Sequence, residues 1–253
     1  MNLKEMIRGA NLPITMRHER WLETNSTPKY TETALDFARA ALSHELGGNR
    51  SRSSDFRASG AGSCQRRQLF TANDVRGITD ISSDLANIFA TGNFLHLKWQ
   101  MAGLTEGWLT QAEVPYESDE YSFGGTLDGI IYDGSLFEFK SINARGFSSV
   151  QMYGPKHDHI LQAHAYMYLA DLHAVSFVYE NKDNGEWREF RMERDDLICD
   201  AIVGMIDDMT EMKRNQTYPE PLNKCLDREG WQYRQCPFRE VCLDEKWEPW
   251  VYE

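Results

Sequence analysis

The sequence predicts an α/β protein in which a small central β-sheet is flanked by helices. The middle of the chain holds short apolar runs bounded by Gly, Asp and Ser turns, which are typical of strands. Helical periodicity precedes and follows these runs. No internal repeat or long linker divides the 253 residues, a length that suits one large domain or one domain with appendages.

The first part of the chain is expected to be helical. The segment 31–46, TETALDFARAALSHEL, is the clearest amphipathic helix, and Gly47-Gly48 ends it. Residues 49–63 are rich in Ser, Gly and Arg and are expected to form a mobile loop. A short helix around CQRRQLF follows, and then a longer helix from about Ile81 to Met101 with a Ser/Asp run at its cap.

The central strands are expected at QAEVPYE, YSFGGTLDGIIYD and SLFEFKSI, and Asp133-Gly134 predicts a hairpin between the last two. The segment HDHILQAHAYMYLADL is predicted to be a helix. A second hairpin should join HAVSFVYEN to EWREFRMER through the turn DNG, and a last long helix should cover 194–216. Five aromatic residues fall at core positions of these elements: Trp99, Phe137, Phe139, Phe177 and Tyr179.

The composition, 41% hydrophobic and 26% charged, is ordinary for a globular protein. No apolar run reaches the roughly 18 residues that cross a bilayer, and the segment MNLKEMIRGANLP lacks the apolar centre of a secretory signal. We therefore expect a cytoplasmic, reducing location without a membrane partner. In that setting the five cysteines are not expected to form a disulfide framework.

Two carboxylates and a lysine form the most informative group in the sequence. Asp128 is expected to close one strand, with Glu138 and Lys140 on its hairpin partner. Side chains alternate along a strand, so Glu138 and Lys140 share a face, and Phe137 and Phe139 occupy the other. Carboxylates on adjacent strands can hold Mg²⁺ or Mn²⁺ together, and the lysine can act on a water or on a phosphoryl transition state. The same pattern also fits solvated charges on the outer face of a hairpin.

Helical motifs flank this group on both sides. Gly92 and His96 are four apart on one helix face, and Gln162 and Tyr166 are four apart on a later helix. With the segments GGTLDG and EFK between them, these motifs stand in the order typical of the RecB-like branch of the PD-(D/E)XK nucleases. The chain therefore resembles that family across its middle section.

The resemblance implies a restriction-endonuclease-like core with a small mixed sheet, and it implies roles for individual residues. Ligands of a Mn²⁺ or Mg²⁺ ion would be His96, Asp128, Glu138 and the carbonyl group of Phe139. Lys140 would serve the nucleophilic water, while Gln162 and Tyr166 would steady Lys140 and the DNA backbone. A histidine ligand favours manganese beside magnesium.

The cysteines extend the resemblance to an iron–sulfur subgroup, which includes the CRISPR-associated RecB-like exonucleases and the AddB nuclease domain. Those proteins hold a 4Fe–4S cluster with one cysteine before the core and three after it, which here are Cys64, Cys225, Cys236 and Cys242. The spacing from Cys225 to Cys236 is wider than usual in the family. Cys199, the remaining cysteine, is expected to be a buried thiol in the last long helix. A zinc site and thiols without a metal are the alternatives.

The net charge of −12 opposes long-range attraction to DNA, but the local field within about 10 Å decides binding. Residues 50–67 hold five arginines against the single acidic residue Asp55. Arg50, Arg52 and Arg57 are expected to contact the DNA backbone, although a solvated basic loop is the alternative. Phe56 is expected to be exposed among them and to stack on single-stranded DNA.

These patterns predict three segments. Residues 1–75 are helical and carry the basic loop and Cys64, residues 76–216 form the nuclease core, and residues 217–253 form an iron–sulfur segment packed on the first. The expected activity is hydrolysis of phosphodiester bonds in DNA, as an exonuclease that prefers single strands; the resemblance alone implies the exonuclease action and this preference. A structure-specific endonuclease, a non-catalytic DNA-binding or assembly subunit and a redox sensor are the alternatives.

Overall fold

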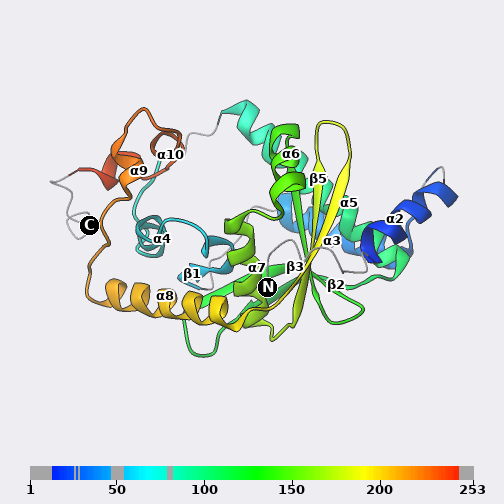
Figure 1. The fold of residues 1–253 in the computed structure, drawn as a ribbon, viewed down its shortest axis with the longest axis horizontal. Coiled ribbons are helices and arrows are strands. Elements are labelled where there is room, and N and C mark those ends of the chain that lie inside the picture. The colour runs from blue at the N-terminus through cyan, green and yellow to red at the C-terminus, as the bar shows by residue number, and fades with distance from the viewer. Residues whose placement is uncertain (1–12, 26, 28, 47–53, 79–81, 245–253) are drawn as a thin grey trace.

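The computed structural model describes residues 13–25, 27, 29–46, 54–78 and 82–244. Its centre is a six-stranded sheet in the order β1-β3-β4-β5-β6, with β2 paired to β3 (Figure 1). The strands are β1 Phe56–Arg57, β2 Leu109–Glu117, β3 Phe123–Ile131, β4 Leu136–Ile142, β5 Ala174–Asn181 and β6 Trp187–Glu193. The β1–β3 and β4–β5 pairs are parallel and the others are antiparallel, so the predicted mixed central sheet is confirmed.

Helices flank this sheet on both sides (Figure 1). The longer ones are α2 Pro13–Thr24, α3 Glu32–Leu46, α5 Ser83–Glu106, α7 His157–Leu169 and α8 Asp196–Arg214. The shorter ones are α4 Gln65–Ala72, α6 Ala144–Tyr153, α9 Asn223–Leu226, α10 Trp231–Arg234 and α11 Arg239–Cys242. Among the described residues, no helix combines the length and the apolar character that crossing a membrane requires.

Each face of the sheet is buried in its own apolar core. On one face, Leu127 of β3 packs in a core with Met167 of α7 and with residues of α8. On the other face, Phe137 and Phe139 of β4 pack with Trp99 of α5. The five aromatic residues predicted for the core are all buried: Trp99, Phe137, Phe139, Phe177 and Tyr179.

Both predicted hairpins form where the turn residues indicated. Gly134 has a φ of 79° and Gly185 a φ of 80°, a region that glycine enters at little cost. In the first turn, Oδ1 of Asp133 accepts a hydrogen bond from the backbone N–H of Ser135 at 3.0 Å. Strand β4 therefore returns beside β3, and β6 returns beside β5.

Strands β3 and β4 pair only next to their hairpin and then diverge. Their register contains two pairs, Gly129↔Phe137 and Ile130↔Leu136. Toward the start of β3, strand β1 occupies the edge that β4 has left, with Phe56 opposite Phe123. The result is a fork between β3 and β4, closed by the hairpin at one end and bordered by β1 at the other.

Two elements differ from the sequence-based expectation. Part of the segment 49–63 forms β1 and a 3-10 turn, Ala58–Gly60, and Phe56 is 1% exposed in the core shared with Leu127. The expectation of an exposed, base-stacking Phe56 is therefore wrong, because pairing with β3 turns this side chain inward. Helix α6 was not expected, since Gly146 and two serines weaken its helix propensity. Its buried residues Phe147 and Val150 anchor it instead.

Candidate active site

The fork places Asp128 of β3 and Glu138 of β4 on opposite faces of the sheet, yet close enough for the charge of Asp128 to raise the pKa of Glu138. Leu127 faces the core of α7, so the next residue, Asp128, faces α5. Glu138 alternates with Phe137 and Phe139, which pack toward α5, so its side chain faces α7. The backbone N–H of Phe139 donates to Oδ2 of Asp128 at 2.8 Å, which ties the two strands across the fork.

Helix α5 contributes His96, which lies on the same side of the fork as Asp128. Nε2 of His96 lies 3.0 Å from Oδ2 of Asp128, and the imidazole ring stacks on Phe139 with centroids 5.7 Å apart. A Cβ atom at Gly92 would lie 3.5 Å from Oγ of Ser141, which is an ordinary contact. Gly92 therefore lies where α5 passes the end of β4. The imidazole ring of His96 does not need the space that is left by the missing side chain.

Helix α7 contributes the groups on the other side. Nζ of Lys140 lies 2.6 Å from Oε1 of Glu138 and donates to Oε1 of Gln162 at 3.1 Å. Tyr166 is buried one turn further along α7, and a Cβ atom at Gly125 would lie 2.7 Å from its ring. Gly125 therefore leaves the space that the Tyr166 ring occupies beside β3. Lys140 is thus held between the buried carboxylate and the helix.

Burial and the neighbouring charges perturb the pKa values of this group. Burial disfavours a charged His96, but the carboxylates, Asp128 above all, outweigh it and raise the pKa of His96 to about 9. Burial, together with the charge of Asp128, raises the pKa of Glu138 to about 7. Burial opposes ionisation of Asp128 as well, yet His96 and Lys140 lower its pKa overall. Such opposed shifts in one small group are common at functional sites.

The donor set fits a divalent cation. Oε1 of Glu138 is paired with Lys140, but Oε2 of the same buried carboxylate has no hydrogen-bond partner among the described residues. A buried carboxylate oxygen without a partner is costly, and a cation would supply one. In the part of the chain that the structure describes, no group of three His, Cys, Asp or Glu side chains is arranged to coordinate a metal ion. Lys140 and His96 contact the carboxylates instead.

Glu113 of β2 belongs to this group and was not identified from the sequence. The pairs Ala112↔Gly129 and Val114↔Leu127 put it beside Asp128. Its φ of 52° is unusual for a residue inside a strand, and such strain of about 1–3 kcal/mol is concentrated at functional sites. Nε2 of Gln100 donates both to Oε1 of Glu113 at 2.8 Å and to the carbonyl of Asp128 at 2.9 Å. An acidic residue in the strand next to β3 was visible in the sequence, but the register that brings it to Asp128 was not.

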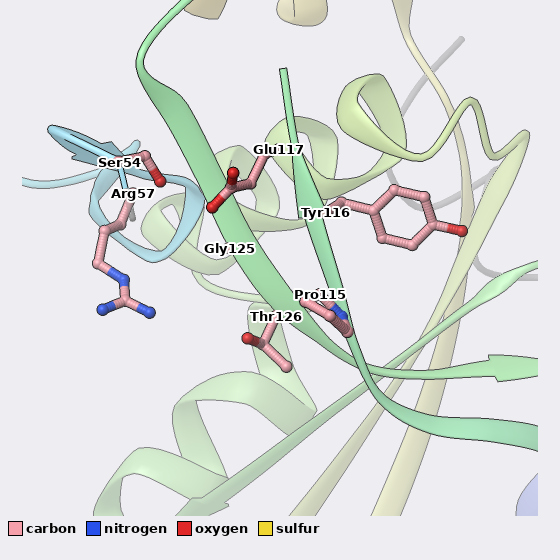
Figure 2. Close-up of a pocket in the computed structure, with 7 residues that line it drawn as sticks. All are labelled: Ser54, Arg57, Pro115, Tyr116, Glu117, Gly125 and Thr126. Atoms are coloured by element: carbon pink, nitrogen blue, oxygen red, sulfur yellow. The ribbon is translucent and has the colours of Figure 1, made fainter. Parts of the chain in front are cut away.

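A pocket lies beside β3, at Gly125 and Thr126, two residues of the strand that shortly precede Asp128. Its lining residues are Ser54, Arg57, Pro115, Tyr116, Glu117, Gly125 and Thr126. Arg57 and Glu117 come from the strands on either side of β3, and the ring of Tyr116 points away from both (Figure 2). The Arg57 side chain is exposed, and its positive charge partly offsets the burial that raises the pKa of Tyr166. Arg50 and Arg52 lie outside the described residues.

The four cysteines of the predicted cluster lie where α4 meets the C-terminal segment. Cys64 directly precedes α4, and the pKa of Cys225 is raised by burial and by the neighbouring Cys64 and Cys236. Burial also raises the pKa of Cys242, with Cys236 and Cys64 contributing. The thiols thus share one neighbourhood, although they are not arranged as a ready coordination sphere.

Arg66 and Phe70 join α4 to the segment that follows α8. The Arg66 guanidinium donates to the carbonyl groups of Pro219 at 2.8 Å and Cys242 at 3.3 Å. The Phe70 ring packs on the rings of Tyr218 and Phe238. Cys199 is elsewhere: it is 1% exposed inside α8, which agrees with the expected buried thiol.

Comparison with known proteins supports the fold. No protein-family model and no curated protein sequence matches the chain. Among solved structures, LHK-Exo, an alkaline exonuclease from Laribacter hongkongensis crystallised with dAMP, aligns with a TM-score of 0.52 at 19% identity over 65% of this chain and 90% of its own. The protein SSO0001 aligns with a TM-score of 0.51 at 17% identity over 85% of this chain and 96% of its own.

These alignments establish the architecture. The chain shares with LHK-Exo and SSO0001 a mixed α/β fold in which helices flank a mixed central sheet. The fold class predicted from the sequence is therefore confirmed. At these identities the likeness concerns the fold alone, and an activity is argued from the site.

Proposed function

We propose that this protein is a divalent-metal-dependent nuclease that hydrolyses phosphodiester bonds in DNA, acting as an exonuclease on single strands. The observation that carries this proposal is the meeting of Asp128 and Glu138 in the fork, with Lys140 in contact with Glu138 and held by Gln162. Carboxylates from adjacent strands with a lysine beside them suit phosphoryl-group chemistry. In a purely structural hairpin, burying these charges would only cost free energy of desolvation.

His96, Asp128, Glu138 and the carbonyl of Phe139 would hold Mn²⁺ or Mg²⁺. The N–H and the C=O of a strand residue point to the same side. Because the N–H of Phe139 points to Asp128, its carbonyl group faces the fork too. When bound, the ion would polarise the phosphate and lower the pKa of an attacking water.

The chain's own residues would perform the remaining steps. Lys140 would orient the water and stabilise charge on the phosphoryl oxygens, and Gln162 would keep its ammonium group in place. Tyr166, whose pKa is raised by burial and by the charge of Glu138, stays protonated and can donate to a backbone phosphate. Arg57, with the hydroxyl groups of Ser54 and Thr126 in the same pocket, would contact an adjacent phosphate.

The proposal includes a structural 4Fe–4S cluster on Cys64, Cys225, Cys236 and Cys242, as in the iron–sulfur subgroup that the sequence resembles. The shared neighbourhood of the four thiols supports it. A cluster there would tie residues 1–75 to residues 217–253 around the nuclease core and constrain the unfolded chain.

End-labelled single- and double-stranded DNA tests the activity. The protein is incubated with each substrate and Mn²⁺ or Mg²⁺, in parallel with Lys140→Ala, and the products are resolved by length. We expect progressive shortening of single strands from an end and no product with Lys140→Ala. Internal cuts, including in circular DNA, would identify an endonuclease. Binding without cleavage by the parent protein would identify a non-catalytic DNA-binding subunit.

A further inference from the structure

One side of α5 runs from the core, across the candidate active site and out beyond the sheet. Residues three or four apart share a helix side, so Gly103, Trp99, His96, Gly92, Phe89 and Leu85 follow one another along this face. Trp99 and Gly103 are buried in the core, and His96 stands in the fork. The N-terminal turns of α5 then project past the sheet at the top of the view (Figure 1).

The projecting part of this face is apolar and exposed. Phe89 is 53% exposed and Ile88, beside it, is 47% exposed, while Leu85 is partly covered. We call Leu85, Ile88 and Phe89 the apolar ledge. Between Asp84 and Lys98 the only ionisable side chain is His96. An exposed helix normally carries charged residues, and a contiguous apolar patch indicates a contact surface.

The ledge lies next to the candidate active site. It continues the helix side that carries His96, so a DNA strand leaving the fork toward the start of α5 would pass over it. With a rise of 1.5 Å per residue, Phe89 lies about 10 Å from His96 along the helix axis, a span of about three stacked nucleotides. None of the three ledge residues carries a charge that would attract phosphates. The uncharged aromatic faces of bases suit it better.

We propose that the apolar ledge, with Phe89 at its centre, stacks the unpaired bases of the DNA strand whose backbone lies in the fork. The inference rests on the proposed nuclease function for the location of that strand. Bases in a duplex are already stacked on one another and cannot turn to Phe89, so the ledge favours single-stranded over double-stranded DNA. The preference for single strands was expected only from the family resemblance. Stacking on Phe89 would give it a physical basis in this chain.

Helix α5 offers a matched pair of phenylalanines for the test. Phe94 is 62% exposed on the same helix but points away from the side of His96, five residues after Phe89. Phe89→Ala and Phe94→Ala are made in the full chain carrying Lys140→Ala, which is expected to prevent cleavage. Each binds, in Mg²⁺, a fluorescent single-stranded oligonucleotide and an abasic chain of the same length, and affinity is measured by fluorescence anisotropy.

We expect Phe89→Ala to weaken binding of the normal oligonucleotide about tenfold, because one base stack is lost, and to leave binding of the abasic chain unchanged. Phe94→Ala should alter neither. Phe89→Trp should retain the affinity of the parent, and its indole fluorescence should be quenched by the normal oligonucleotide. Circular dichroism checks that the helix content of each variant is unchanged.

The inference is overturned if Phe89→Ala and Phe94→Ala bind the normal oligonucleotide equally, or if Phe89→Ala loses as much affinity for the abasic chain. A fall in molecular mass by light scattering with Phe89→Ala, without a change in DNA affinity, would assign the ledge to a second copy of the chain. Cleavage is assayed separately with Lys140 restored. Cleavage without the contrast between the two phenylalanines rejects the ledge alone, and the contrast without cleavage rejects the nuclease alone.

Discussion

Oε1 of Glu113 lies 3.8 Å from Nδ1 of His96, on the side of the imidazole ring away from Asp128. Metal-binding histidines commonly donate their second ring N–H to a carboxylate, which holds the ring and its tautomer in place. Gln100 keeps Glu113 in position by donating to the same oxygen at 2.8 Å. Gln100 therefore holds Glu113 beside the Nδ1 side of His96, where the carboxylate can orient the imidazole ring.

Glu113→Gln is expected to weaken Mn²⁺ binding by about 10–100-fold, the usual cost of losing a carboxylate behind a histidine ligand. Isothermal titration calorimetry with Mn²⁺ measures it on the metal-free protein. Glu117→Gln, an exposed carboxylate on the same strand, is the control and should bind as the parent does. Equal affinities for the two variants would remove Glu113 from the site.

Glu138→Gln and Lys140→Ala should separate metal binding from catalysis. Glu138 is a proposed ligand, so its amide variant should lose both Mn²⁺ affinity and cleavage. Lys140→Ala should keep Mn²⁺ binding yet lose cleavage by orders of magnitude, because the group serving the water contributes several kcal/mol. Asp119→Ala, an exposed acidic residue between β2 and β3, should change neither. Cleavage by Lys140→Ala near the parent rate would reject its proposed role.

Metal binding should release protons near neutral pH. In the metal-free protein the pKa of His96 is about 9 and that of Glu138 about 7, both above their ordinary values. Both groups must lose a proton to become ligands, so protons compete with the ion below these pKa values. The Kd for Mn²⁺ should therefore fall as pH rises from 6 to 8. Calorimetry in buffers of different ionisation enthalpy counts the protons, and proton uptake would contradict the assignment.

Cysteine variants test the proposed cluster. The purified protein should be brown, with the broad visible absorbance of thiolate-bound iron. Substitution of Cys64, Cys236 or Cys242 by Ser should bleach it, and Cys225→Ser should do the same despite the wide spacing. Cys199→Ser, buried in α8, should leave the colour unchanged. A colourless protein that contains zinc by elemental analysis would replace the iron–sulfur proposal with a zinc site.

Arg57→Ala should weaken binding of single-stranded DNA and reduce its dependence on salt. Each lost arginine–phosphate contact lowers the slope of log K against log salt by about 0.7 for single strands. Arg188 is an exposed arginine on β6, at the opposite end of the sheet order from β1, and Arg188→Ala should leave the slope unchanged. Mn²⁺ affinity should be the same in both variants. An unchanged slope with Arg57→Ala would move the DNA path away from this pocket.

Local features of this chain could be predicted from the sequence. The turns at Gly134 and Gly185, the opposite faces of Glu138 and Phe139, and the burial of Cys199 all follow from residues within one element or one hairpin. Turn chemistry and the two periodicities act over a few residues, so they can be recognised without knowing the fold. The candidate residues of the site came from motifs of this kind.

The sequence by itself determined the class of fold and which residues could carry chemistry, whereas the tertiary structure decided how they meet. The fork depends on where β4 leaves β3, the inward turn of Phe56 depends on β1 pairing with β3, and the approach of Glu113 to His96 depends on the register of β2. A shift of register by one residue reverses every side chain on a strand, and no local pattern sets the register between distant segments. The packing of whole elements against one another sets the register of β2 on β3, and this register places Glu113 beside Asp128.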